Sequence, residues 1–162
     1  MTNLSPPKPL FDTLEQLLLQ AETCAWTYLD DAYNLADIAI SSQFLLAYKG
    51  SQGTFNGYRR EVERFLHWSV LSANKTLADL NREDIEEFIE FSQLPPKHWI
   101  GTSKPARFLT KNALRVPNPA WRPYVVTVSK AAHRRGQVPE IKNFELSQSS
   151  LRELFAILSS FY

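Results

Sequence analysis

An acidic run near the middle of the chain carries the residue type that metal binding and acid–base catalysis use. A helix is predicted to begin just before this run, and acidic side chains in a first helical turn stabilise its positive end. The remaining acids of the run fall on a face that water can solvate. We therefore interpret the group as a solvated helix face rather than a metal or catalytic site: Glu83, Asp84, Glu86, Glu87 and Glu90.

The three histidines, His67, His98 and His133, are the other residues that could take part in catalysis. None has a second histidine, a cysteine or a paired acid at the spacing that a zinc or hydrolase site needs. His67 falls instead on the arginine-bearing face of a predicted helix. The glycines are scattered and match no phosphate-binding loop. The sequence thus predicts no catalytic residue, no metal ligand and no cofactor.

Arginines on the most clearly periodic helix indicate another chemistry, contact with a polyanion. Its apolar side chains share one face, and Arg59, Arg60 and Arg64 occupy an exposed one. Helix N-termini bind phosphates, and arginine side chains reach phosphates or guanine edges. The alternative is an ordinary surface on which Arg59 pairs with Glu63 and Arg60 with Glu61.

The charges are sorted along the chain, although the net charge is only +1. Residues 1–94 hold 7 Lys and Arg against 14 Asp and Glu, whereas residues 95–146 hold 10 against 2. Such sorting favours a segment that faces a polyanion, and a solvated linker is the alternative. The basic positions that we assign to a DNA-backbone footprint are Lys104, Arg107, Lys111, Arg115, Arg122, Lys130, His133, Arg134 and Arg135.

Helical periodicity covers most of the rest of the chain. Residues 1–9, which hold three prolines, are predicted to be a flexible tail, and residues 10–162 a single domain. Asn34 and Asn81 are predicted N-caps, each with an acid three residues later that completes a capping box. Helices are expected over residues 11–30, 34–50, 51–72, 81–94 and 147–162.

Residues 95–146 show no helical period and are rich in proline. Tyr124–Ser129 is the one run that resembles a strand, as one arm of a hairpin. We expect an all-α bundle of four or five helices that carries a long, partly extended basic insertion. Trp99 and Trp121 indicate that parts of the insertion pack onto the helices.

The last predicted helix begins after Ser147 and still has an apolar face where the sequence ends. Because nothing caps it there, it looks cut in mid-helix, and Phe161 and Tyr162 are expected to be frayed or to pack on another molecule. The inward stripe is predicted to be Leu151, Leu154, Phe155, Leu158 and Phe161.

Composition narrows the cellular setting. Cys24 is the single cysteine, so no internal disulfide can form. No apolar run approaches the roughly 20 residues of a membrane-spanning helix. We expect a cytoplasmic chain that has no membrane partner.

Several segments together resemble one protein family. The run Thr54–Trp68 (TFNGYRREVERFLHW) is similar to the second helix of the N-terminal core-binding, or SAM-like, domain of the tyrosine recombinases, the phage-integrase family. Lys75–Phe88 resembles its linker and third helix, and Leu94–Gly101 resembles a turn of a phage-integrase subgroup. Residues 121–124 and 146–162 resemble the later loop and the start of the closing helix.

The resemblance implies a helical domain that clamps duplex DNA for site-specific recombination and integration. Its partners would be the DNA, the protein's own catalytic domain and other recombinase protomers. The catalytic domain that cuts and rejoins DNA is expected to be absent here, since His133–Gly136 lacks the His-x-x-Arg spacing of that domain. The fragment itself is thus expected not to be an enzyme. DNA contacts are implied for Thr54, Tyr58, Arg59, Arg60 and Arg64, and the charge pattern adds Lys104, Arg107, Lys111, Lys130, Arg134 and Arg135.

A second function remains open on the sequence. The chain could be a helical protein–protein interaction module without DNA binding. In that case the exposed face of the last helix and the aromatic loop would bind a protein. Salt dependence separates the two functions, because DNA binding weakens steeply with salt and an apolar interface hardly responds.

Overall fold

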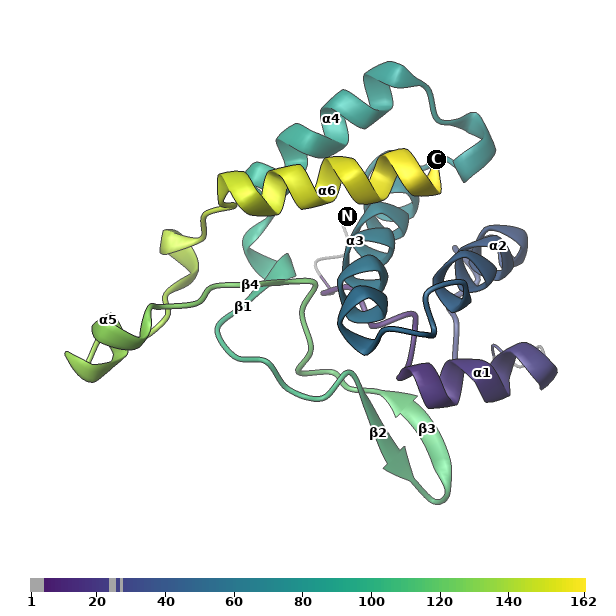
Figure 1. Ribbon diagram of the computed structural model, residues 1–162, viewed down its shortest axis with the longest axis horizontal. Helices are drawn as coiled ribbons and strands as arrows, with labels where there is room; N and C mark the ends of the chain where they lie inside the picture. The colour runs from purple at the N-terminus through teal and green to yellow at the C-terminus, as the bar shows by residue number, and fades with distance from the viewer. Residues whose placement is uncertain (1–4, 24–25, 27) are drawn as a thin grey trace. The chain divides into compact units, whose positions relative to one another are not determined.

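A computed structural model describes residues 5–23, 26 and 28–162 of the chain (Figure 1). The described residues form two compact units. The helical unit consists of Leu10–Phe88 and Gln148–Tyr162, and the basic unit consists of Ile89–Ser147 with the N-terminal residues up to Pro9. The basic unit is therefore inserted, in sequence, between two parts of the helical unit.

The helical unit is organised around its longest helix. In Figure 1 this helix, α3, lies between α2 and α6, and both pack against it, while α1 packs on α2. The side chains of α3 that are buried include Phe55, Val62, Phe65 and Leu66, at the spacing that turns one helical face inward. The helices are α1 (Leu14–Thr23), α2 (Leu35–Leu46), α3 (Gln52–Leu71), the first part of α4 (Arg82–Gln93) and α6 (Gln148–Phe161), with a short 3₁₀ turn at Leu77–Asp79.

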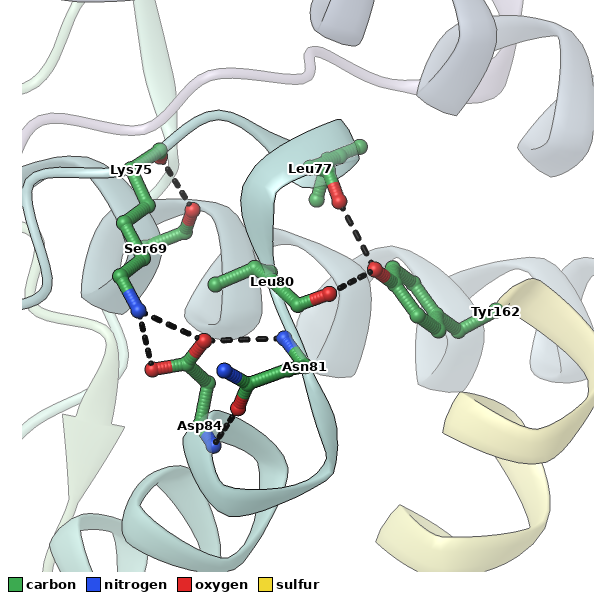
Figure 2. A network of polar contacts seen from close by, with 7 residues as sticks. All are labelled: Ser69, Lys75, Leu77, Leu80, Asn81, Asp84 and Tyr162. Carbon is green, nitrogen blue, oxygen red and sulfur yellow. Dashed lines mark hydrogen bonds and ion pairs between the residues drawn. The ribbon is translucent and has the colours of Figure 1, made fainter.

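Side-chain caps fix where these helices begin. The Asn34 side chain accepts hydrogen bonds from the backbone N–H groups of Ala36 and Asp37, so the predicted N-cap is confirmed. The capping box predicted there is wrong, because Asp37 Oδ2 instead accepts from the Leu77 backbone N–H at 3.0 Å. At α4 the cap is reciprocal: Asp84 N donates to Asn81 Oδ1 at 3.0 Å, and Asn81 N donates to Asp84 Oδ2 at 2.9 Å (Figure 2). The capping box predicted at Asn81 is confirmed.

A polar network holds the connection between α3 and α4 (Figure 2). Lys75 Nζ donates to both carboxylate oxygens of Asp84, at 2.8 and 2.9 Å. Ser69 Oγ donates to the Lys75 carbonyl oxygen at 2.7 Å. The Tyr162 hydroxyl, from the chain's last residue, lies 2.8 Å from the Leu77 carbonyl oxygen and 2.9 Å from that of Leu80. The expectation that Tyr162 is frayed is wrong, because its hydroxyl finds backbone acceptors.

The inward stripe predicted for α6 is only partly confirmed. Leu154 and Leu158 are buried, but Phe155 is 48% exposed. Phe161 packs its ring against Phe44 of α2, with ring centroids 5.0 Å apart. Ile157, which the stripe omitted, is buried. The helix is thus rotated slightly from the predicted orientation.

The face of α3 predicted to be exposed contains buried polar groups. His67 is fully buried, and its Nδ1 lies 2.6 Å from the Tyr33 hydroxyl. Burial is the main cause that raises the pKa of Tyr33. Glu63 accepts hydrogen bonds from the backbone N–H groups of Leu10 and Phe11, at 2.7 and 3.2 Å. Hydrogen bonds to residues remote in sequence make these burials possible.

The basic unit is mostly irregular and contains two small sheets. Ile100–Gly101 (β1) pairs in parallel with Tyr124–Val125 (β4), and Phe108–Lys111 (β2) forms an antiparallel hairpin with Leu114–Pro117 (β3). A short helix, α5, covers Lys130–Arg134, and 3₁₀ turns lie at Lys97–Trp99 and Ile141–Asn143.

An aromatic cluster forms the centre of the basic unit. Trp99 and Tyr124 are buried there, and Phe91 and Phe144 pack around them. The Tyr124 hydroxyl lies 3.0 Å from Ser92 Oγ, so the polar end of its buried ring is satisfied. The Trp99 ring packs on Phe91 of α4, with ring centroids 4.9 Å apart, so the expectation that Trp99 packs onto a helix is confirmed.

The predicted all-α class needs correction. The described chain is mostly helical, but its basic unit contains the β1–β4 pair and the β2–β3 hairpin. Tyr124–Ser129 was predicted to be a hairpin arm, whereas only Tyr124–Val125 is a strand, and it pairs in parallel with β1. The described first helix covers Leu14–Thr23, and residues 28–30 are not helical, so the helix does not extend to residue 30 as predicted; residues 24, 25 and 27 of the predicted helix lie outside the described residues.

Candidate nucleic-acid interface

Arg60 and Arg64 of α3 converge on one buried carboxylate. Arg60 Nε lies 2.9 Å and Arg64 Nη1 lies 3.0 Å from Glu61 Oε1, and the Glu61 side chain is only 4% exposed. Arg60 Nη2 also lies 3.0 Å from Glu153 Oε2 of α6. Burial lowers the pKa of Arg60, but the carboxylates of Glu61 and Glu153 outweigh burial and raise it above its ordinary value. These contacts connect α3 to α6.

The two arginines differ in how much of the side chain is accessible. The Arg64 side chain is 12% exposed, so the expectation that it lies on an exposed face is wrong. The Arg60 side chain is 42% exposed and could reach a ligand only in competition with its two carboxylates. The pairing of Arg60 with Glu61, the alternative that the sequence left open, is present.

Arg59 is held by the segment that precedes α1. Its Nη1 donates to the Asp12 carbonyl oxygen at 2.8 Å, and its guanidinium carbon lies 5.4 Å from the centre of the Phe55 ring. A guanidinium so placed gains both a hydrogen bond and a cation–π contact. Arg59 thus connects α3 to the chain before α1.

Thr54 and Tyr58 also make contacts within the helical unit. The Ser51 hydroxyl donates to Thr54 Oγ1 at 3.0 Å in the first turn of α3. The Tyr58 ring stacks on Phe44 at 5.9 Å and lies 4.1 Å from Tyr48. The five predicted residues of α3 therefore lie on one helix, and their side chains contact other groups of the helical unit.

The predicted cations of the basic unit have different surroundings. No Asp or Glu occurs between Pro95 and Pro139. In the part of the chain that the structure describes, five of these cations are exposed and form no ion pair: Lys104, Lys111, Lys130, Arg134 and Arg135. Such side chains can neutralise phosphates without first giving up a protein carboxylate.

The three remaining arginines of this segment are fixed against the protein. The Arg107 guanidinium carbon lies 4.9 Å from the centre of the Trp121 ring. Arg115 Nη1 donates to Thr110 Oγ1 at 3.0 Å, and Arg122 Nη1 donates to the carbonyl oxygens of Pro119 and Trp121, both at 2.8 Å. These arginines are oriented by contacts within the unit.

Strand pairing brings two distant lysines to one recess. Gly101 pairs with Val125, so the chain leaving β1 and the chain leaving β4 run side by side. Lys104, Lys130 and His133 line the recess between them, whose volume is about 300 Å³. The sequence shows these cations only as separate positions on a loop, because a strand of two residues has no periodicity that a sequence pattern can reveal.

No family model matches this chain, and no curated protein or solved structure matches it significantly. Among residues 5–23, 26 and 28–162, no three His, Cys, Asp or Glu side chains gather where they could hold a metal ion. No helix in the same part of the chain is both long enough and apolar enough to cross a membrane. The geometry of the basic unit is therefore the main guide to function.

Proposed function

We propose that this chain binds duplex DNA, mainly through its basic unit. The observation that supports the proposal is a group of five exposed cations that form no ion pair within the described residues: Lys104, Lys111, Lys130, Arg134 and Arg135. They lie in a stretch of 45 residues, 95–139, that contains no acidic side chain. Nothing within that stretch offsets the field that they produce, and such a field attracts a polyanion.

The role of α3 is different in this proposal. Arg59, Arg60 and Arg64 contact groups of the helical unit, so their first role is to hold that unit together. Arg60, whose side chain is 42% exposed against 12% for Arg64, remains the best candidate on α3 for an additional phosphate contact. DNA contacts by Thr54 and Tyr58 are supported only by the family resemblance.

We further propose, from the same resemblance, that the chain is the core-binding part of a tyrosine recombinase. Its catalytic domain would be supplied elsewhere in the parent protein, and other protomers would bind the same DNA. In this arrangement the described chain grips DNA and does not cut it. Incubation with a nicked suicide duplex tests this part, since a covalent protein–DNA adduct formed by this chain alone would overturn it.

Fluorescence anisotropy with a labelled duplex of random sequence tests DNA binding. We expect a Kd of about 10⁻⁴–10⁻⁶ M at physiological salt, the range of largely electrostatic binding. If each of the five exposed cations neutralises one phosphate, log K should fall with log salt at a slope of about −4.5. The absence of binding at low salt would overturn the proposal.

One observation favours the second function, a protein-binding surface on α6. Phe155 is 48% exposed while its neighbour Leu154 is 1% exposed, so α6 presents a large apolar side chain to solvent. Single exposed apolar residues are common on protein surfaces, and for this reason we rank this function second. Binding to a protein that is insensitive to salt and is lost in Phe155→Ser would support it.

A further inference from the structure

The β2–β3 hairpin is a two-stranded ribbon with a short, exposed tip. Its register pairs Leu109 with Val116, Thr110 with Arg115 and Lys111 with Leu114. In Figure 1 the hairpin extends away from the β1–β4 pair of the same unit. Residues 110–114 are all exposed, so the end of the ribbon is accessible to a ligand.

The turn of the hairpin has a defined geometry. Asn112 and Ala113 have φ values of 51° and 62°, so both central residues are in the left-handed region. A two-residue turn with positive φ at both positions is the type I′ turn, whose twist matches that of the two strands. The tip is thus a tight connection and not a loose loop.

Alternation along the strands places different side chains on the two faces of the ribbon. Thr110 and Arg115 share one face, where the Thr110 hydroxyl accepts the hydrogen bond from Arg115. The guanidinium carbon of Arg115 also lies 6.0 Å from the centre of the Phe108 ring. Lys111 and Leu114 share the other face, and Leu114 is 68% exposed.

We propose that this hairpin inserts into the major groove of duplex DNA. The inference rests on the proposed DNA binding, and it identifies the hairpin as the element that contacts the base edges. The major groove, about 12 Å wide, admits a two-stranded β-ribbon, whereas the minor groove is only about 6 Å wide. A hairpin with a two-residue turn and four-residue strands is short enough to enter end first.

The side chains at the tip suit the chemistry of base edges. Lysine and arginine donate to the acceptors of guanine, asparagine pairs with adenine, and apolar side chains contact the thymine methyl group. Lys111, Asn112, Leu114 and Arg115 supply these four residue types within five consecutive positions, 111–115. Arg115, oriented by Thr110 and Phe108, enters the groove with little side-chain entropy left to lose.

Site-directed cross-linking tests the groove assignment. In a Cys24→Ser background, Asn112→Cys places one thiol at the hairpin tip. Duplexes carry a disulfide-activated tether on cytosine N4, which lies in the major groove, or on guanine N2, which lies in the minor groove. Lys142→Cys is the matched control, because Lys142 is an exposed residue of the same unit outside the hairpin.

We expect the Asn112→Cys protein to cross-link faster to the major-groove tether than to the minor-groove tether, and faster than the Lys142→Cys protein does. Equal rates with the two tethers, or with the two proteins, would overturn the hairpin assignment while leaving DNA binding intact. A Cys24→Ser parent that shows no DNA binding in anisotropy would overturn the proposed function as well. The outcomes therefore separate the two proposals.

A second measurement does not depend on an introduced thiol. Lys111→Ala combined with Asn112→Gly removes two polar tip groups and keeps a residue that accepts positive φ at the turn. On a duplex selected from a random pool, this variant should lose affinity on the order of tenfold. Lys142→Ala is the control for removal of a lysine outside the hairpin. An equal, small loss in both variants would mean that the hairpin does not read bases.

Discussion

The hydroxyl group of Tyr162 donates to the carbonyl oxygen of Leu77, 85 residues earlier in the chain, at 2.8 Å. The Leu80 carbonyl oxygen lies 2.9 Å from the same hydroxyl, so one phenol connects the end of α6 to the turn before α4 (Figure 2). This contact fixes the position of the C-terminal end of α6, for which the sequence predicted no cap.

Tyr162→Phe should destabilise the protein by about 0.5–1.5 kcal/mol, because it removes the hydroxyl and keeps the ring. Urea unfolding followed by circular dichroism measures the change. Ser160→Ala is the control on the same helix end, since the Ser160 hydroxyl bonds only locally, to the Ala156 carbonyl oxygen. A Tyr162→Phe protein as stable as its parent would show that the contact contributes nothing.

Adjacent residues of α6 should respond very differently to truncation. Leu154 is 1% exposed, so Leu154→Ala should cost about 2–5 kcal/mol through lost burial and the cavity that remains. Phe155 is 48% exposed, and Phe155→Ala should change the stability by less than about 0.5 kcal/mol. Thermal unfolding of the two variants checks this, and similar losses would mean that α6 is oriented differently.

Asp84 should make stability sensitive to acid. The hydrogen bonds from Lys75, and next that from the Asn81 backbone, lower the pKa of Asp84 below its ordinary value. A carboxyl whose pKa is lower in the folded protein stabilises it above the unfolded pKa of about 3.9. That contribution is lost as the pH falls below about 4, through the folded pKa.

Asp84→Asn should therefore be less stable than the parent at pH 6, and the gap should narrow below about pH 4. Urea unfolding between pH 2 and 6, at about half-unit steps, measures both curves. Exposed Asp31→Asn serves as the control for the loss of one negative charge. A gap that stays constant across this range would argue against the ion pair with Lys75.

The arginines of the two units should separate stability from DNA binding. Arg64 contacts buried Glu61, so Arg64→Ala should cost about 1–3 kcal/mol by leaving that carboxylate with one partner fewer. Arg134→Ala combined with Arg135→Ala should change the stability by less than about 0.5 kcal/mol per residue and lower the salt slope of DNA binding by about 2. Chemical unfolding and anisotropy on both variants provide the comparison. If Arg64→Ala instead weakened DNA binding and the double variant lost only stability, the DNA interface would lie on α3.

Ala113→Gly should stabilise the hairpin by about 0.5–1 kcal/mol. Ala113 has a φ of 62°, which is strained for a residue with a Cβ and unstrained for glycine. Asn-Gly is also the preferred pair for a type I′ turn. Amide hydrogen exchange at residues 108–117 should slow in the variant, and faster exchange would contradict the turn geometry.

Local interactions explain what the sequence could predict. The caps at Asn34 and Asn81 involve residues two or three positions apart, so the chain order alone contains them. The buried face of α3 followed from periodicity for the same reason. The start of α6 at Gln148 was also correct.

Long-range contacts explain what the sequence could not predict. His67 looks exposed on a helical wheel, but it is buried because Tyr33, 34 residues earlier in the chain, provides a polar partner. The hairpin was missed because its turn is Asn-Ala, which lacks the glycine that usually marks such a turn. For the candidate interface, the sequence identified the basic segment but could not separate its free cations from its anchored ones.

The insertion of the basic unit also determines when the helical unit can be completed during synthesis. α6 packs on α3, yet residues 89–147 are translated between them. At about 5–20 residues per second, the ribosome needs on the order of ten seconds to pass from Ile89 to Tyr162. Throughout that interval the surface of α3 that α6 will cover is exposed on the nascent chain. A chaperone that binds apolar helices would thus meet this protein at one predictable stage, after α4 has emerged and before α6 has.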